Sequence, residues 1–296
     1  MVFLAVFYVL ARNSASNEIA LDRVVTVTIW SIALIITGAL AWMLIYLVVK
    51  GAHDLTPGFF VHDMKGVGPL NPGGGVKAAI IGSAEQVGIA TVLVVPLAIL
   101  TAIYLNEIKG RLAWPVRFIV DALVGLPSIV AGLIVYSIWV VHHRFSGVAG
   151  SAALTVLMLP YVTRVSEEVL RTVPDSLREA SLALGAPRWR VIMQVVVPTA
   201  RAGLLTAVIL GVAFGVGETA PVQLTAGGSD YTNLNPLHGQ QADLPLFVFN
   251  LIFQPNKVDN QRAFSALLVL VILVLVLFVA ARFVSNRGQK KLRGGR

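Results

Sequence analysis

Cysteine is absent from the 296 residues, and only 13% of them are charged. The first absence excludes a disulfide framework, a thiolate metal site and a cysteine nucleophile. The second lies well below the share of about 25% that soluble domains carry. With 56% hydrophobic residues and a mean hydropathy of +0.80, the chain is predicted to be an integral membrane protein.

Motifs of nucleotide-binding proteins and hydrolases are also missing. The Pro72-Gly73-Gly74-Gly75 run lacks the G-x-x-x-x-G-K-[ST] order of a phosphate-binding loop, so any ATP must be used by another subunit. Neither H-E-x-x-H nor G-x-S-x-G is present, which counts against an intramembrane enzyme. We therefore expect a non-enzymatic chain without a cofactor or a metal.

Six stretches are apolar over a length that suits a bilayer, because about 20 helical residues cross a hydrocarbon core of roughly 30 Å. They are Val24 to Val49, Gln86 to Asn106, Ala122 to Val141, Phe145 to Thr163, Ala202 to Gly217 with a lead-in from Val191, and Ala263 to Ala281. The sequence thus predicts an all-α integral membrane protein with six transmembrane helices over residues 24–285. Residues 1–23 form an N-terminal segment, and residues 286–296 form a basic tail.

The net charge of +8 is distributed unequally between the two sides of the predicted membrane. One side holds 16 lysines and arginines, including residues 109–117, 164–190 and the C-terminal tail, whereas the other holds 6, with Arg201 left uncounted within its span. Because basic loops stay in the cytoplasm, the termini and residues 174–198 are expected there. This arrangement favours membrane orientation, not nucleic acid, as the reason for the charge.

Some shorter features also carry expectations. Leu244 to Phe253 is too short to cross a bilayer and is interpreted as re-entrant or interfacial. Gly211-x-x-x-Gly215 suits the close approach of two helices, which we expect at a subunit interface. Met1 to Ala11 is apolar but lacks the charged start of a signal peptide, and none is predicted.

Residues 174–198 are a polar island between two apolar stretches. Ser176 with Glu179 three residues later predicts a helix start by a capping box, and Gly185 predicts a left-handed helix stop. Leu177, Ala180, Ala183 and Leu184 share one face at helical spacing, while Arg178 and Glu179 point elsewhere. An amphipathic helix of about two to three turns is unstable alone, so a partner must cover its apolar face.

The same island resembles the E-A-A loop of ABC importer permeases. Glu179-Ala180-Ser181 is followed by three residues, Gly185, nine residues and Val195-x-Val197-Pro198, with Ser181, Val195 and Val197 as mild departures. The resemblance implies a cytoplasmic coupling helix that docks in a cleft of a separate ATPase subunit. Its docking residues would be Leu177, Arg178, Glu179, Ala180, Ser181, Leu184 and Gly185. The alternative is an amphipathic connector that lies on the bilayer surface.

A second resemblance, to phosphate-importer permeases, rests on Gly217-Glu218-Thr219-Ala220-Pro221 and on the runs G-L-P-S-I-V-A-G-L and A-I-Y-L-N-E. It implies a translocation path, for which Arg164, Glu167, Glu218 and Thr219 are the candidates. Arg164 would offer donors to a phosphate dianion, although a surface ion pair with Glu167 and Glu168 is the alternative.

Glu218 repels phosphate unless it is protonated or paired. We therefore expect it to pair with an arginine, cap a helix or act in gating. Related permeases commonly carry arginine where this chain has Phe214, so the family's charge network is not transferred intact. The candidates to replace the missing arginine are Arg164, Arg201 and an arginine of a partner subunit.

Together the resemblances predict a permease of the type I ABC importer kind that takes up inorganic phosphate. Its expected partners are a second homologous permease, two ATPase subunits, an extracytoplasmic phosphate-binding protein and the lipid bilayer. A permease for another oxyanion, sulfate or molybdate, is one alternative. An ion-coupled secondary transporter is another, although it would need matched internal repeats that the sequence does not show.

Overall fold

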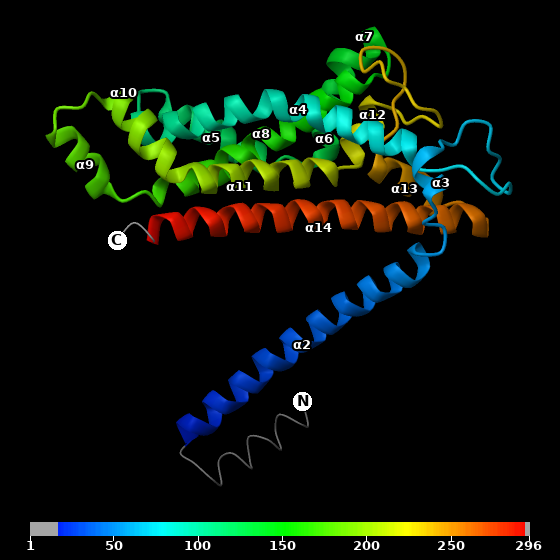
Figure 1. The fold of residues 1–296 in the computed structure, drawn as a ribbon, viewed down its shortest axis with the longest axis horizontal. Helices are drawn as coiled ribbons and strands as arrows, with labels where there is room; N and C mark the ends of the chain where they lie inside the picture. Colours follow the sequence, from blue (N-terminus) through cyan, green and yellow to red (C-terminus); the bar gives the residue numbers. More distant parts are fainter. Residues whose placement is uncertain (1–16, 294–296) are drawn as a thin grey trace.

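The computed structural model describes residues 17–293, and Figure 1 shows a helical bundle with one helix that diverges from it. Within this range every regular element is helical, and the one strand-like contact is an isolated bridge between Gly227 and Gln241. The predicted all-α class is therefore confirmed. Met1 to Ala11 and the last three residues of the basic tail lie outside the described residues.

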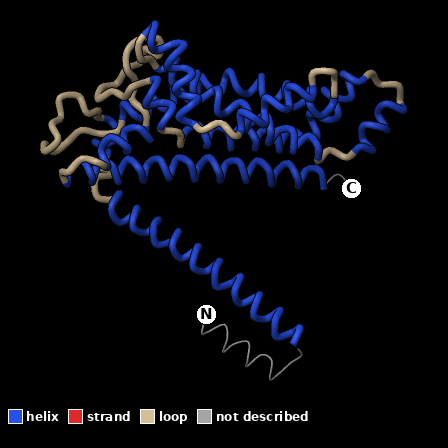
Figure 2. The backbone as a smooth tube through the Cα atoms, turned by 180° about the vertical axis from the view of Figure 1, so that it is seen from behind, coloured by secondary structure: helices blue, strands red, loops and turns tan. Residues whose placement is uncertain are grey.

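The helices are named by their labels in Figure 1. In chain order they are α2 (Asn17–Gly51), α3 (Pro57–Val61), α4 (Lys77–Ile103), the π-helical turn η1 (Tyr104–Ile108), α5 (Ala113–Val124), α6 (Ser128–Val135), η2 (Tyr136–Val140), α7 (Val141–His143), α8 (Gly147–Arg171), α9 (Asp175–Ala183), α10 (Arg188–Val191), η3 (Ile192–Val196), α11 (Val197–Val216), α12 (Ala220–Thr225), α13 (Leu244–Ile252) and α14 (Lys257–Arg293). Figures 1 and 2 show most loops at one end of the bundle, opposite the end that carries α9.

Among the described residues, five helical segments are long and apolar enough to cross a membrane. They are Leu21–Gly51, Lys77–Ile108, Gly147–Arg171, Arg188–Val216 and Lys257–Val284. Apart from their ends, they match five of the six predicted spans.

The remaining span, expected as one helix over Ala122 to Val141, is two helices. The segments Ala113–Val124 and Ser128–His143 meet at an angle of 106°, and they give a sixth crossing only if the bent pair counts as one. The break falls at Gly125-Leu126-Pro127, where Pro127 caps α6. Proline lacks an N–H and disfavours helical geometry in the residue before it, so this run favours a break, although Pro96 and Pro160 lie inside the continuous helices α4 and α8.

The core of the bundle lies where α4 packs on α8, with α11 and α14 against them. Gly211 and Gly215 of α11 belong to this packing. A Cβ at Gly211 would lie 2.2 Å from Val162, and one at Gly215 would lie 2.6 Å from the sulfur of Met158. The expectation that these glycines form a subunit interface is therefore wrong, because they allow α11 to approach α8 of the same chain.

The C-terminal end of the long helix α2 lies at the bundle, and the rest of the helix diverges from it (Figure 1). There Gly51 lies against Phe264 and Leu268 of α14. Apolar side chains farther along α2, such as Trp30 and Trp42, are more than 70% exposed. Such a surface suits lipid or a second subunit. Helix α13 has nine residues, which agrees with the expectation that it does not cross the membrane.

Candidate functional site

The amphipathic helix predicted after residue 174 is α9 (Asp175–Ala183). Its N-cap is Pro174, and no side chain binds the free N–H groups there. The predicted capping box of Ser176 and Glu179 is therefore wrong, because the helix begins before Ser176 and includes it in the first turn. The predicted stop is confirmed, since Gly185 has a left-handed φ of +80° that glycine adopts without a Cβ clash.

One face of α9 is apolar and has little cover within the described chain. Leu177 is 40% exposed, and Leu184 at the C-terminal cap is 88% exposed. Glu179 and Ala180 are also exposed. The short helix thus presents an open apolar surface beside the exposed carboxylate of Glu179, which is the form that suits insertion into a groove.

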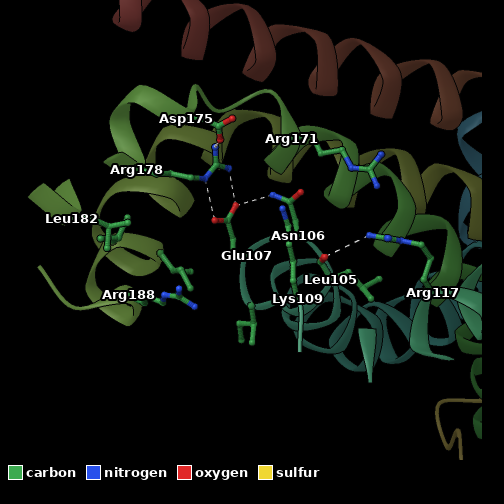
Figure 3. Close-up of a pocket in the computed structure, with 13 residues that line it drawn as sticks. Leu105, Asn106, Glu107, Lys109, Arg117, Arg171, Asp175, Arg178, Leu182 and Arg188 are labelled. Atoms are coloured by element: carbon green, nitrogen blue, oxygen red, sulfur yellow. Dashed lines mark hydrogen bonds and ion pairs between the residues drawn. The ribbon is translucent and has the colours of Figure 1, made fainter. Parts of the chain in front are cut away.

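Arg178 instead turns toward the bundle, as Figure 3 shows. Its guanidinium donates to both carboxylate oxygens of Glu107, at 2.7 and 3.1 Å. It also donates to Asp175 at 2.9 Å and to the carbonyls of Leu170 and Val173. The hydrogen bonds that Arg178 donates to Glu107 are the largest cause that holds the pKa of Arg178 above its ordinary value.

These contacts give Arg178 a role different from that of its neighbours on α9. Glu107 belongs to η1 at the end of α4, whereas Leu170 belongs to α8. One side chain therefore connects α9 to two long helices of the bundle. Ser181 is likewise satisfied locally, because its hydroxyl donates to the carbonyl of Leu177. Arg178 positions the segment from the inside, while Leu177, Glu179 and Leu184 remain open to a partner.

A second charged cluster surrounds Glu167 of α8, whose side chain is fully buried. Arg117 of α5 and Arg171 of α8 both bind its Oε1, the latter at 2.7 Å. Arg164 lies 3.5 Å from its Oε2, which agrees with the alternative of an ion pair between these two residues. Glu168 pairs with Arg171 instead, at 3.5 Å, which corrects its expected place beside Arg164.

Two of the three stretches that resemble phosphate permeases meet where α6 packs on α12. Ser128 at the start of α6 is within hydrogen-bonding reach of Glu218, which follows α11. Beside them, a Cβ at Gly132 would lie 2.7 Å from the Cα of Pro221 in α12. Thr219 is the N-cap of α12 and is partly buried. The break in the third predicted span thus places Ser128 next to Glu218.

Phe214, where arginine was expected, stacks on Tyr161 of α8 with ring centroids 5.1 Å apart and planes at 16°. Arg164 lies one helical turn beyond Tyr161, and Glu218 lies about one turn beyond Phe214. Arg164 also lies 3.4 Å from Asp121 of α5 and keeps 41% of its side chain exposed. Because α8 and α11 run in opposite directions, with Gly203 against Val169 and Gly215 against Met158, Arg164 and Glu218 lie on opposite sides of the Tyr161–Phe214 stack.

The family described as binding-protein-dependent transport system inner membrane component matches residues 94–293, which include α8, α9 and Glu218. The chain belongs to this family. Over 258 residues, this inner-membrane component is 42% identical to phosphate transport system permease protein PstA 1 of Mycobacterium tuberculosis (strain ATCC 25618 / H37Rv), covering 85% of this chain and 84% of that protein. It is 37% identical to PstA of Pasteurella multocida (strain Pm70), over 82% of this chain and 86% of that protein.

Solved structures support the same fold for this inner-membrane component. An inward-facing MetNI methionine ABC transporter chain aligns with a TM-score of 0.57 at 20% identity, covering 72% of this chain and 95% of that one. A chain of an amino acid ABC transporter aligns with a TM-score of 0.51 at 16% identity, covering 73% and 92%. The fold is therefore that of a type I ABC importer permease.

The structure also adds residues to the candidate site that the sequence did not assign. Glu107 lies in the A-I-Y-L-N-E run and Ser128 lies in G-L-P-S-I-V-A-G-L, so resemblance marked both stretches without giving either residue a role. Arg117 was counted only as a positive charge. Its partner Glu167 lies 50 residues away, and no local periodicity reports such a pair.

Proposed function

We propose that this inner-membrane component is a PstA-type permease subunit of an ATP-driven importer of inorganic phosphate. The observation that carries the proposal is the identity of 42% to a phosphate transport system permease over 85% of the chain. An alignment of that length within 296 residues includes both α9 and the turn at Glu218. The likeness therefore extends to the two regions that would couple and transport.

The proposed partners follow from surfaces that the chain leaves open. The exposed apolar face of α9 supports docking to a separate ATPase subunit, because this chain has no phosphate-binding loop of its own. A second homologous permease would complete the translocation path, of which this chain forms half. The full assembly would then hold two permeases, two ATPases and an extracytoplasmic phosphate-binding protein, embedded in lipid.

The orientation is part of the same proposal. Figure 1 shows α9, the start of α2 and the end of α14 at the same end of the molecule. These three elements belong to the side to which the sequence assigns 16 lysines and arginines, whereas the other side has 6. The positive-inside rule supports a cytoplasmic location for that end and for both termini.

In the proposed mechanism, ATP binding closes the two ATPases, and their clefts move the α9 helices of both permeases together. Arg178 transmits the movement to α4 through Glu107 and to α8 through the Leu170 carbonyl. The bundle then opens outward to the loaded binding protein, and phosphate is released inward after hydrolysis. Phosphate and nucleotide bias this equilibrium only through different affinities for the two states.

For the translocation path we propose Arg164 as a phosphate contact and Glu218, with Thr219, as a gating element. Arg164 is partly exposed, and Glu167 and Asp121 fix its position. Glu218 is near Ser128, and within residues 17–293 no ion pair joins it to a cation. This position supports gating over direct phosphate binding, because an unpaired carboxylate repels the dianion.

The test is ATP-dependent phosphate uptake by vesicles that hold this chain with its candidate partners. We would compare wild type with Glu179→Arg and Gly185→Asp. Gly66→Asp is the matched control, because Gly66 also has a left-handed φ and open space around it, but lies in a loop before α4. The α9 variants are expected to lose uptake, and ATPase should fail to co-purify where docking is lost.

Unchanged uptake in both α9 variants would contradict the coupling role. Uptake that persists without the ATPase would favour an ion-coupled transporter. Sulfate and molybdate are included as competitors, and stronger competition by either than by unlabelled phosphate would reassign the substrate to that oxyanion.

A further inference from the structure

A pocket of about 830 Å³ opens between α9, η1 and α10 (Figure 3). Its charged lining residues are Lys109, Arg117, Arg171, Arg178, Arg188, Glu107 and Asp175. Five cations therefore face two carboxylates. Such an excess in a partly enclosed space raises the local concentration of anions.

Some of these cations already have partners in the chain. Arg178 forms ion pairs with Glu107 and Asp175. Arg117 and Arg171 both form ion pairs with Glu167, which is not among the lining residues. No ion pair to a carboxylate of the described residues is found for Lys109 or Arg188. These two lie on different walls, since Lys109 ends η1 and Arg188 begins α10.

We propose that this pocket binds a phosphate group between Lys109 and Arg188. Arginine binds phosphate oxygens through a planar fork of donors, and lysine adds a compact charge. Two cations on different walls balance the charge of a phosphate dianion and exceed the single charge of a phosphodiester headgroup. The group could come from the headgroup of an anionic phospholipid or from inorganic phosphate, and the same residues would hold either.

The surroundings of the pocket favour the lipid source. The end of η1, the turn after it and the start of α5 expose Ile108, Leu112, Trp114 and Phe118, which lie within nine residues of Lys109 in the chain, and the rings of Trp114 and Phe118 stack on each other. Aromatic residues beside lysine and arginine are typical of the level of lipid headgroups. Basic pockets between helices at that level bind anionic headgroups. The pocket is also much larger than one inorganic phosphate.

Occupancy of the pocket would affect α9. Lys109 and Arg188 line the same pocket as Arg178 and Glu107, so a phosphate group bound by both cations would join η1 to α10. Binding would then hold the coupling segment against the bundle and make coupling depend on the anionic lipid around the protein. This site does not depend on which substrate the permease carries.

The binding test uses the assembled complex of permeases and ATPases, without nucleotide or binding protein. Native mass spectrometry would count phosphatidylglycerol retained after transfer into phosphatidylcholine nanodiscs, and equilibrium dialysis would measure inorganic phosphate. The pocket variant is Lys109→Gln with Arg188→Gln. The matched control is Arg111→Gln with Arg190→Gln, which removes the same charge from the same two segments at residues that do not line the pocket.

The control is expected to bind like wild type, whereas the pocket variant should bind roughly 10- to 30-fold less phosphatidylglycerol. A loss confined to inorganic phosphate would still support the site and would identify free phosphate as its ligand. Equal binding of both ligands by the pocket variant and the control would overturn the proposal.

A second measurement needs no variant and so does not depend on folding of the mutant. An amine-reactive reagent would label Lys109 of the wild-type complex in nanodiscs with and without phosphatidylglycerol. Lys109 should be protected by the anionic lipid, while Lys65, in a loop far along the chain, should label equally in both. Equal labelling of Lys109 in both lipids, with inorganic phosphate also without effect, would contradict the site.

Discussion

Arg178 of α9 donates hydrogen bonds to both carboxylate oxygens of Glu107, which lies 71 residues earlier in the chain. The two side chains are 17% and 7% exposed, so water screens the pair only weakly. Because Arg178 also binds carbonyls at the end of α8, the pair fixes a short helix that has few other contacts with the bundle. The apolar face of α9 stays free as a result.

Replacing Arg178 with lysine is expected to reduce ATP-dependent uptake while the ATPase still co-purifies. Lysine keeps the charge but loses the fork that binds both oxygens of Glu107. A double-mutant cycle with Glu107→Gln should give a coupling energy of about 1–3 kcal/mol in thermal unfolding. Arg190→Lys on neighbouring α10 is the control. If Arg178→Lys matches that control in uptake and stability, the proposed transmission through this pair fails.

Glu218→Gln is expected to abolish most phosphate uptake without loss of assembly, because it removes the charge of the proposed gate but keeps its shape. Ser128→Ala should lower uptake less, since it removes one hydrogen bond to that carboxylate. Ser137→Ala is the matched control, as its hydroxyl donates to the carbonyl of Leu133 on the same helical segment. Uptake in Glu218→Gln equal to that of Ser137→Ala would rule out the gating role.

Two glycines of α4 should respond in opposite ways to alanine. A Cβ at Gly82 would lie 2.0 Å from the carbonyl oxygen of Ala242, which cannot move without its backbone, whereas nothing lies within 4 Å of one at Gly88. Gly82→Ala should therefore destabilise the fold by about 1–3 kcal/mol. Gly88→Ala should be neutral or slightly stabilising because alanine favours helix. Thermal unfolding in detergent measures both, and similar melting temperatures would refute the close contact.

Burial raises the pKa of Asp243, at the N-cap of α13, from 3.8 to about 7. Its carboxylate accepts hydrogen bonds from Ser83 and from the N–H of Leu246. The folded protein thus binds this proton more tightly than the unfolded chain, so the free energy of unfolding should fall as pH rises from about 4 to about 7. The slope from this group is at most about 1.4 kcal/mol per pH unit.

Asp243→Asn should remove this contribution and keep the cap, because asparagine is an equally good N-cap residue. Thermal unfolding of both proteins across that pH range measures the difference. Parallel pH profiles for wild type and variant would show that Asp243 does not titrate between the two states.

Local features of the sequence determined most of the helices. Long apolar runs placed five spans, because the length of a helix that crosses a bilayer depends on few interactions beyond its own residues. Gly185 likewise marked the end of α9, since a left-handed turn is a preference of one residue. The capping box at Ser176 failed because Pro174 and Asp175 already begin the helix.

The tertiary structure decided which residues meet. Arg178 forms an ion pair with Glu107, and Arg117 forms one with Glu167. Ser128 lies within hydrogen-bonding reach of Glu218. These contacts exist only because distant helices pack side by side. The sequence marks these residues as charged or polar, but their partners depend on helix angles and on the bend of 106° between α5 and α6. The periodicity of one helix shows which residues share a face, whereas the packing of several helices determines what that face contacts.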